Sequence, residues 1–313
     1  MTLLLRPYPS TSSATSILRQ PLTITKSPIT RKLAFFATLS KSINRAMSSV
    51  ATLEQKLKAL ESLSACDVSD ALVKLQKGPA GSPVRAGQLA DISPMSPFIG
   101  RQANKSKIIA PAVTFKFIPK GDAAPTVSDP EKNGFPPGKH WVDWNQPGTI
   151  AVLDQPAEQY CAVLGGIMAA RMSYIGVKAV VVNGRVRDLA ELSVSGLHVS
   201  ALQRICFQLP PSSLTKHFQR TQVWSKATST VGTGAEAKAG LRNVPIDFNG
   251  VTVDTGDIVF CDPLEGVVVI PKDLLDDVLE LSPKLIAQDD KVKADVEKGM
   301  SVFEAMKKYR NIL

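Results

Sequence analysis

The sequence predicts an α/β domain that runs from about Leu53 to the C-terminus. The first observation behind this prediction is an apolar strand–helix–strand unit between residues 149 and 184. The second is a later run of apolar strands joined by glycine turns, and the third is helical periodicity at both ends of the region. Because 44% of the 313 residues are hydrophobic, the chain can bury a sizeable core.

The first 50 residues differ in composition from the rest. Seven of the 37 basic residues and none of the 28 acidic residues lie there, so the remainder has 30 basic and 28 acidic residues and a net charge of +2. A segment rich in Ser, Thr, Leu and Arg without acids resembles a mitochondrial transit peptide. We therefore expect residues 1–50 to be a transit peptide or a disordered tail, and residues 53–313 to be one domain. Translation from Met47 would instead give a cytoplasmic protein.

Two helices and a strand are predicted at the start of the domain. The leucines that recur at helical spacing are Leu53, Leu57, Leu60 and Leu63. A second helix is predicted for CDVSDALVKLQ, with Asp67 or Ser69 as its N-cap, because a short side-chain oxygen can accept an unpaired N–H of the first turn. Residues 79–106 are predicted to be loop, and the alternating pattern of residues 107–118 predicts a strand.

Residues 119–148 form a long insertion that is rich in proline and glycine and contains two tryptophans. We expect no regular structure in it. A loop of this length in a compact domain is usually a lid or a binding loop. The alternative is a solvent-facing decoration whose tryptophans pack on the surface.

The central unit predicts a parallel crossover. TIAVLDQ and VKAVVVNG are apolar and β-branched, as is typical of buried strands, and the helix between them, GGIMAARMSYIG, has glycine at both ends. Two such strands joined through a helix are parallel and connected with a right-handed crossover. A second helix, RDLAELSVSG, follows, then the strands of GVTVDTGDIVFCDPLEGVVVIP, and a charged helical tail from Lys272 onward.

Several classes of function have no support in the sequence. No basic stripe with interleaved aromatics indicates nucleic-acid binding, and no run of about 18 apolar residues indicates a membrane span. The glycines near residue 232 do not fit a nucleotide-binding motif. The four cysteines and three histidines lack metal-ligand spacing, and we expect the cysteines to be buried free thiols.

Two places in the central unit suggest chemistry. Gly165 and Gly166 precede a helix whose first N–H groups lack partners, so a carboxylate or phosphate could bind there; a simple tight turn is the alternative. Arg187 and Asp188 follow the second strand, where ligands of open α/β sheets bind. Arg187 offers a planar fork for a carboxylate, and Asp188 offers a hard oxygen for Mg²⁺ or Mn²⁺. The alternative is a structural pair in which Asp188 caps the next helix. Because the two places are one crossover apart, we expect them to share a pocket.

The central segment LGGIMAARMSYIGVKAVVVNGRVRDLAEL resembles the RraA-like superfamily. Co-linear matches in CDVSDAL, IIAPAVTFKF, PGTIAVLD and VPIDFNGVTVDTGDIVFCDPLEGVVVIP extend the resemblance over roughly residues 54–311. The superfamily includes 4-hydroxy-4-methyl-2-oxoglutarate aldolases, which also decarboxylate oxaloacetate, and the bacterial regulator of ribonuclease activity. The resemblance implies a swivelling-type β/β/α sandwich that assembles as a homotrimer or homohexamer, with the site between subunits.

The resemblance also implies roles for residues. Asp188 would match the aspartate that ligates a divalent metal, Mg²⁺ or Mn²⁺, and Arg187 would match the arginine that holds the pyruvyl group. Glu265 would be an acidic metal-site residue from a neighbouring subunit, or only a turn carboxylate. The backbone that receives the substrate carboxylate would be formed by Gly165, Gly166, Ile167 and Met168. One departure is that the aldolases carry an aspartate where this chain has Gly166.

These implications predict a metal-dependent carbon–carbon lyase that acts on small 2-oxo dicarboxylic acids and releases pyruvate. Retro-aldol cleavage needs a base and decarboxylation does not, so Gly166 predicts that oxaloacetate decarboxylation is favoured. One alternative is a non-catalytic regulator that binds a protein partner. Another is a related enzyme whose insertion at 119–148 adapts the pocket to a specialised substrate.

Overall fold

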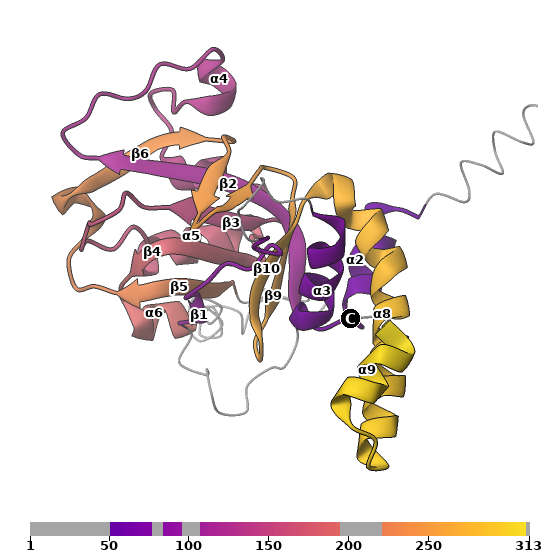
Figure 1. Ribbon diagram of the computed structural model, residues 1–313. Helices are drawn as coiled ribbons and strands as arrows, with labels where there is room; N and C mark the ends of the chain where they lie inside the picture. Colours follow the sequence, from indigo (N-terminus) through magenta and orange to yellow (C-terminus); the bar gives the residue numbers. More distant parts are fainter. Residues whose placement is uncertain (1–50, 77–83, 96–106, 195–220, 311–313) are drawn as a thin grey trace, which may run out of the picture. The chain divides into compact units, whose positions relative to one another are not determined.

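A computed structural model describes residues 51–76, 84–95, 107–194 and 221–310 (Figure 1). Residues Thr52–Leu313 form one contact unit. The described strands are β1 (Ser93–Pro94), β2 (Ile108–Pro119), β3 (Ile150–Asp154), β4 (Ala179–Val186), β5 (Gln222–Thr228), β6 (Ala237–Arg242), β7 (Ile246–Phe248), β8 (Val251–Val253), β9 (Ile258–Asp262) and β10 (Gly266–Ile270). The described helices are α2 (Leu53–Leu60), α3 (Ala65–Leu75), α4 (Pro130–Asn133), α5 (Gly166–Ile175), α6 (Leu189–Val194), α8 (Leu275–Glu297) and α9 (Val302–Arg310), with 3₁₀ turns η1 (Trp141–Trp144), η4 (Thr233–Ala235) and η5 (Lys272–Leu274).

Strand β2 joins the two parts of the main sheet, whose order is β1-β5-β4-β3-β2-β9-β10. Its first residues pair antiparallel with β9, and its later residues pair parallel with β3 and antiparallel with β6. Strands β3, β4 and β5 are mutually parallel neighbours. The predicted parallel crossover β3–α5–β4 is therefore confirmed, and it brings the carboxyl ends of β3 and β4 together.

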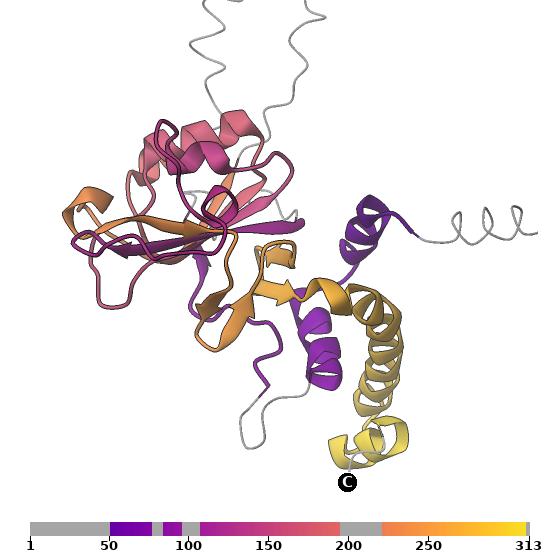
Figure 2. The ribbon, with the colours of Figure 1, turned by 90° about the horizontal axis from the view of Figure 1, so that it is seen from above.

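The sheet is covered on both faces, and the side chains of β3 and β4 alternate between the two covers. Val152 and Val181 pack in one apolar cluster, which includes the β7–β8 hairpin and the fully buried Trp224. Leu153 and Val182 pack in the other cluster, beneath α5. This alternation is the period of two that a strand imposes. In Figure 2 the helices of residues 150–194, in pink, lie on one side of the strands.

A third apolar cluster joins β9 and β10 to helices α2, α3 and α8. Helix α3 begins at Ala65, and its N-cap is Ser64, whose side chain accepts the N–H of Asp67. The Asp67 carboxylate in turn accepts the N–H of Ser64, so the two residues form a capping box. The prediction that Asp67 or Ser69 is the N-cap is therefore wrong, because the helix starts earlier than its apolar periodicity suggests.

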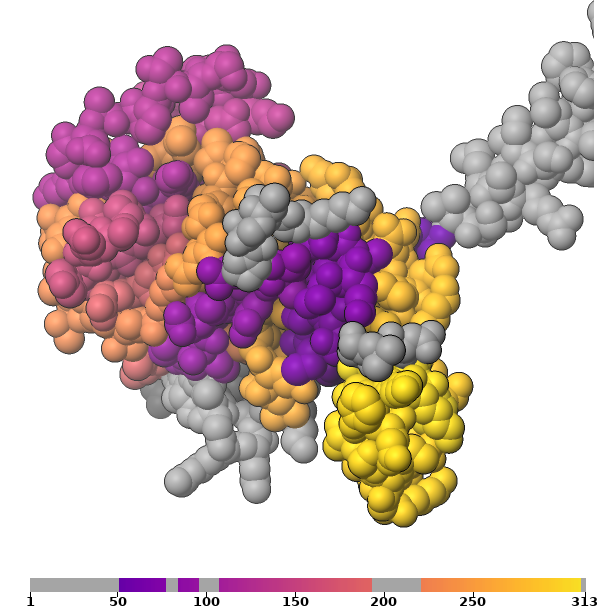
Figure 3. All heavy atoms as spheres, viewed as in Figure 1, coloured from indigo at the N-terminus to yellow at the C-terminus, as the bar shows by residue number. Residues whose placement is uncertain are grey.

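The charged tail is helical, as predicted, and Figure 3 shows α8 and α9 in gold and yellow at the surface. Within the described ranges, no helix is long and apolar enough to cross a membrane. Cys161 and Cys261 are buried free thiols as expected, whereas Cys66 is exposed at the start of α3. Cys206 lies outside the described residues.

The insertion at 119–148 contains α4 and η1, so the prediction that it has no regular structure is wrong. Trp141 packs edge-on against Phe115 and Phe117 of β2, with ring centroids 5.6 and 5.2 Å apart. The guanidinium of Arg242 lies 3.8 Å from the ring centroid of Trp144, and its Nε donates to the carbonyl of Gly134. Both tryptophans therefore pack against the rest of the domain, and the role of the insertion as a lid or binding loop stays a prediction.

Candidate functional site

Three segments that are distant in sequence meet at the end of β4. After β3 the chain runs beside the last residues of β4, where Leu164 bridges to Val186 in parallel fashion and its carbonyl accepts the N–H of Arg187 at 3.0 Å. On its other side the same segment bridges from Ala162 to Gly232. The start of α5, the Arg187–Asp188 pair and residues 231–233 are therefore neighbours.

The first amide of α5 binds Asp188. Gly165 is the N-cap of the helix and supplies no capping side chain. The N–H of Gly166 instead donates to Asp188 Oδ2 at 3.1 Å, and Arg187 Nε lies 3.4 Å from the same oxygen. Asp188 has a φ of +61°, a left-handed conformation that turns the chain from β4 into α6. The structure thus brings Gly165, Gly166, Arg187 and Asp188 together, as the crossover predicted.

The first helical hydrogen bond of α5 runs from the N–H of Ala169 to the carbonyl of Gly165, at 3.1 Å. The amides of Ile167 and Met168 have no acceptor among the described residues, as is usual in a first helical turn. The Ile167 side chain is 75% exposed, whereas Met168 packs on the apolar cluster beneath α5. Two free amides and one guanidinium therefore lie at the same helix end, and this arrangement suits a carboxylate.

Glycines on both sides of this cluster leave room for its side chains. A Cβ at residue 165 would lie 2.6 Å from Asp188 Oδ2, and a Cβ at residue 232 would lie 2.8 Å from Arg187 Nη1. Such distances are too short for non-bonded atoms, so a larger residue at either position would make the end of the Asp188 or Arg187 side chain move away from the backbone. The sequence did not point to Gly232 as part of this site, because its local motif resembles no known ligand loop.

Glu191 is a further group that the sequence analysis missed. It lies in the first turn of α6, and its Oε2 is 1.8 Å from the position that a Cβ at residue 166 would occupy. The space beside Gly166 is therefore filled by a carboxylate from another helix. The spacing of three residues after Asp188 was the only available signal, and it is common at the start of any helix.

The Asp188 carboxylate fits a mostly hydrated divalent cation. Its Oδ2 is engaged by Gly166 and Arg187, whereas its Oδ1 has no hydrogen-bond partner in the part of the chain that the structure describes. The side chain is 35% exposed, so water can reach it. Mg²⁺ often binds through one or two carboxylates and keeps several waters. Among the described residues, no group of three or more His, Cys, Asp or Glu side chains could hold a metal.

Glu265 lies elsewhere in the chain, on the turn between β9 and β10. Its exposed side chain accepts the N–H of Cys66 at 3.1 Å, at the start of α3. This position agrees with the turn carboxylate that was one of the two roles considered above, and its bond to the start of α3 is an additional finding. Its contribution to the site of a neighbouring subunit stays a prediction.

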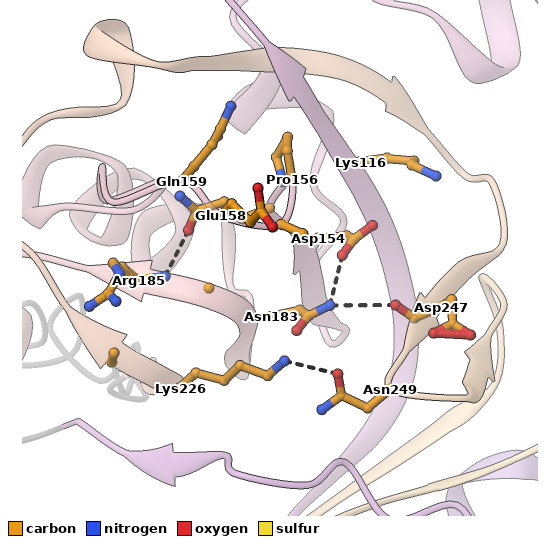
Figure 4. Close-up of a pocket in the computed structure, with 14 residues that line it drawn as sticks. Lys116, Asp154, Pro156, Glu158, Gln159, Asn183, Arg185, Lys226, Asp247 and Asn249 are labelled. Carbon is orange, nitrogen blue, oxygen red and sulfur yellow. Dashed lines mark hydrogen bonds between the residues drawn. The ribbon is translucent and has the colours of Figure 1, made fainter.

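A pocket of about 620 Å³, lined largely by polar and charged residues, lies at the carboxyl ends of β3 and β4 (Figure 4). Lys116, Asp154 and Asn183 are register partners on three adjacent strands, and Asn183 Nδ2 donates to Asp154 Oδ1 at 2.8 Å. Burial raises the pKa of Asp154. The hydrogen bond from Asn183 and the charge of Lys116 lower this pKa and only partly offset the effect of burial. The lining includes Arg185 and does not include Arg187 or Asp188. The pocket and the Arg187–Asp188 site both lie along β4 and its end. The pocket lining carries both cationic and carboxylate side chains.

Comparison with known proteins agrees with the fold. Protein DlpA of Legionella pneumophila is 25% identical over 225 residues, which are 71% of this chain and 30% of DlpA. A protein of Alkalilimnicola ehrlichii named "Putative 4-hydroxy-4-methyl-2-oxoglutarate aldolase" is 31% identical over 128 residues, 41% of this chain and 63% of that protein. The chain thus spans less than two thirds of the length of either relative.

Two solved structures have the same fold. One is an uncharacterized protein of Pseudomonas syringae, with a TM-score of 0.55 and 19% identity, covering 82% of this chain and 98% of that one. The other is a Streptomyces coelicolor protein described as an unusual member of the RNase ES inhibitor RraA protein family. Its TM-score is 0.51 at 18% identity, and the match covers 79% of this chain and 97% of that one. The α/β fold that the resemblance implied is therefore confirmed.

The sequence profile of the RraA-like family, described as Aldolase/RraA, matches residues 65–218 and 216–269. These ranges include the predicted crossover, the Arg187–Asp188 pair and all but the last residue of the β9–β10 hairpin. The chain belongs to the RraA-like family.

Proposed function

We propose that this protein is a divalent-metal-dependent carbon–carbon lyase that acts on small 2-oxo dicarboxylic acids. The observation that supports it most directly is the convergence of the Asp188 carboxylate, the Arg187 guanidinium and the first amides of α5. The aldolase names of family members support a lyase at the level of the family. The substrates we propose are oxaloacetate and 4-hydroxy-4-methyl-2-oxoglutarate, both of which would release pyruvate.

The chain's own groups would bind and orient the substrate. The free amides of Ile167 and Met168 and the fork of Arg187 would hold the carboxylate next to the 2-oxo group, because helix-start amides and guanidinium groups both favour an anion. Asp188 would hold Mg²⁺ or Mn²⁺ through its free oxygen. The ion would supply Lewis-acid polarisation of the 2-oxo group. Arg187 would also keep the substrate in a fixed orientation while the carbon–carbon bond breaks.

The test is a turnover assay of both substrates with Mg²⁺, with Mn²⁺ and after EDTA treatment. We expect pyruvate to form only with the ion present, at rates above those of the ion alone, since free metal ions also promote oxaloacetate decarboxylation. A heat-denatured sample at the same ion concentration is the control. Turnover that is unchanged by EDTA would contradict the metal requirement, and no turnover of either substrate would favour the regulator or a specialised substrate.

We propose that the protein assembles as a homotrimer or homohexamer, with Glu265 reaching the Asp188 site of a neighbouring subunit. Glu265 is exposed, so it is accessible to a second copy of the chain. Light scattering should give a mass three or six times that of one chain, and a monomeric mass would contradict this proposal.

We also propose that residues 1–50 direct the protein to mitochondria. A fluorescent protein fused to residues 1–50 should enter mitochondria, and a purely cytosolic signal would contradict this proposal.

A further inference from the structure

The carboxylate of Glu191 lies at the start of α5 beside the proposed substrate anchor. Its Oε2 is 1.8 Å, and its Cβ and Cδ are each 2.7 Å, from the position of a Cβ at residue 166. The side chain therefore packs directly on the backbone of Gly166. This is the residue whose N–H binds Asp188 Oδ2 at 3.1 Å. The two carboxylates thus reach the same peptide from different positions on the chain.

Both oxygens of Glu191 are available to react, whereas one oxygen of Asp188 is engaged and the other is the proposed cation ligand. In the part of the chain that the structure describes, the Glu191 carboxylate forms no hydrogen bond or ion pair, and its side chain is exposed. Asp188 Oδ2 is held by an amide and by Arg187 Nε. A carboxylate without a partner, beside free helix-start amides, can accept a proton from a ligand that those amides anchor. General-base catalysis requires this geometry first and a suitable pKa second.

We propose that Glu191 is the general base for aldol cleavage at this site, an inference that rests on the function proposed above. Glu191 takes the proton from the substrate's C4 hydroxyl. The O–H electron pair becomes the new C4 carbonyl, the C3–C4 bond breaks, and its electron pair moves into the enolate of pyruvate. The proton held by Glu191 then passes to C3. Both products leave as 2-oxo acids, and the carboxylate is regenerated.

The substitution E191Q tests this role, because glutamine keeps the size of the side chain and cannot accept the proton. General-base help is typically worth about 10²–10⁴-fold. We expect E191Q to lower kcat/KM for 4-hydroxy-4-methyl-2-oxoglutarate by about that factor. Oxaloacetate has no hydroxyl proton to remove, so its kcat/KM should fall much less. The ratio of the two values should therefore fall at least about tenfold. The matched control is Glu297→Gln, an exposed position at the end of α8.

A rescue experiment is possible because the Glu191 side chain occupies the space that a side chain at residue 166 would need. Asp at residue 166 would collide with Glu191, so G166D alone should not improve aldol cleavage. In E191A the space is open, and G166D/E191A would return a carboxylate to the same place. We expect E191A to lose aldol cleavage as E191Q does, and the double variant to recover at least about tenfold of it, on the scale that a positioned base provides.

The outcomes separate the two proposals. If wild type cleaves both substrates and E191Q leaves their ratio unchanged, Glu191 is not the base although the lyase function stands. If E191Q unfolds, the substitution E191D and the G166D/E191A rescue decide the same question, because a structural role would not change the ratio of substrates. If wild type turns over neither substrate, the proposed function fails and the role of Glu191 fails with it.

Discussion

Asp188→Asn is expected to remove nearly all lyase activity and to leave the fold and the oligomer intact. Asparagine tolerates the left-handed backbone at this position, where φ is +61°, and its amide oxygen can still accept the N–H of Gly166. The substitution therefore removes the charge that would hold the cation and little else. Lewis-acid stabilisation is worth several kcal/mol, and about 4 kcal/mol corresponds to roughly 10³-fold in rate.

The measurement is kcat/KM for both substrates, with a parallel titration of Mn²⁺ binding and a thermal melt. Asp188→Ala should be equally inactive but less stable, because alanine is disfavoured at positive φ. Asp290→Asn, an exposed carboxylate on α8, is the control and should behave as wild type. Activity that survives both Asp188→Asn and EDTA would rule out a metal held by this residue.

Arg187→Lys is expected to lower kcat/KM by about 10²-fold for every 2-oxo acid that is a substrate. Lysine keeps the positive charge and loses the planar fork that matches a carboxylate. A hydrogen bond to a charged group contributes about 1.5–3 kcal/mol, which sets the size of the effect. Because Arg187 would hold the carboxylate in both the ground and transition states, most of the loss should appear in KM.

Steady-state kinetics on both substrates measures this loss. Arg171→Lys is a matched control, since Arg171 lies on α5, pairs with Asp143 at 2.6 Å and is about as exposed as Arg187. We expect this control to leave KM within about twofold, because an exposed ion pair contributes only about 0.2–1 kcal/mol to stability and Arg171 is not assigned to carboxylate binding. A normal KM in Arg187→Lys would show that the carboxylate binds elsewhere, and the mixed-charge pocket beside Arg185 would be the next place to examine.

Much of the central fold follows from local patterns. The predicted strands at 107–118, 149–155 and 177–184 correspond to β2, β3 and β4, because alternating and continuous apolar runs rich in β-branched residues are typical of strands. Strands β5 and β6 were not predicted, and neither was the helical structure of the insertion. Strand β6 has the sequence AKAGLR, in which a glycine and two cations weaken the alternation of apolar and polar residues that would predict a strand. Its hydrogen-bonded pairing with β2 stabilises it as a strand.

The strand–helix–strand pattern was enough to predict the parallel crossover, and with it the proximity of Gly165 and Gly166 to Arg187 and Asp188. A short βαβ unit leaves few choices, because both residue pairs must lie at the carboxyl ends of adjacent strands. In contrast, the folded chain was needed to see that Gly232 makes room for Arg187 and that Glu191 fills the space beside Gly166. Those contacts depend on the path of the chain after β5 and on the angle between α5 and α6. Neither of these can be derived from local periodicity. The family's aldolases have an aspartate at the position of Gly166, and in this chain the carboxylate of Glu191 occupies the space beside that glycine.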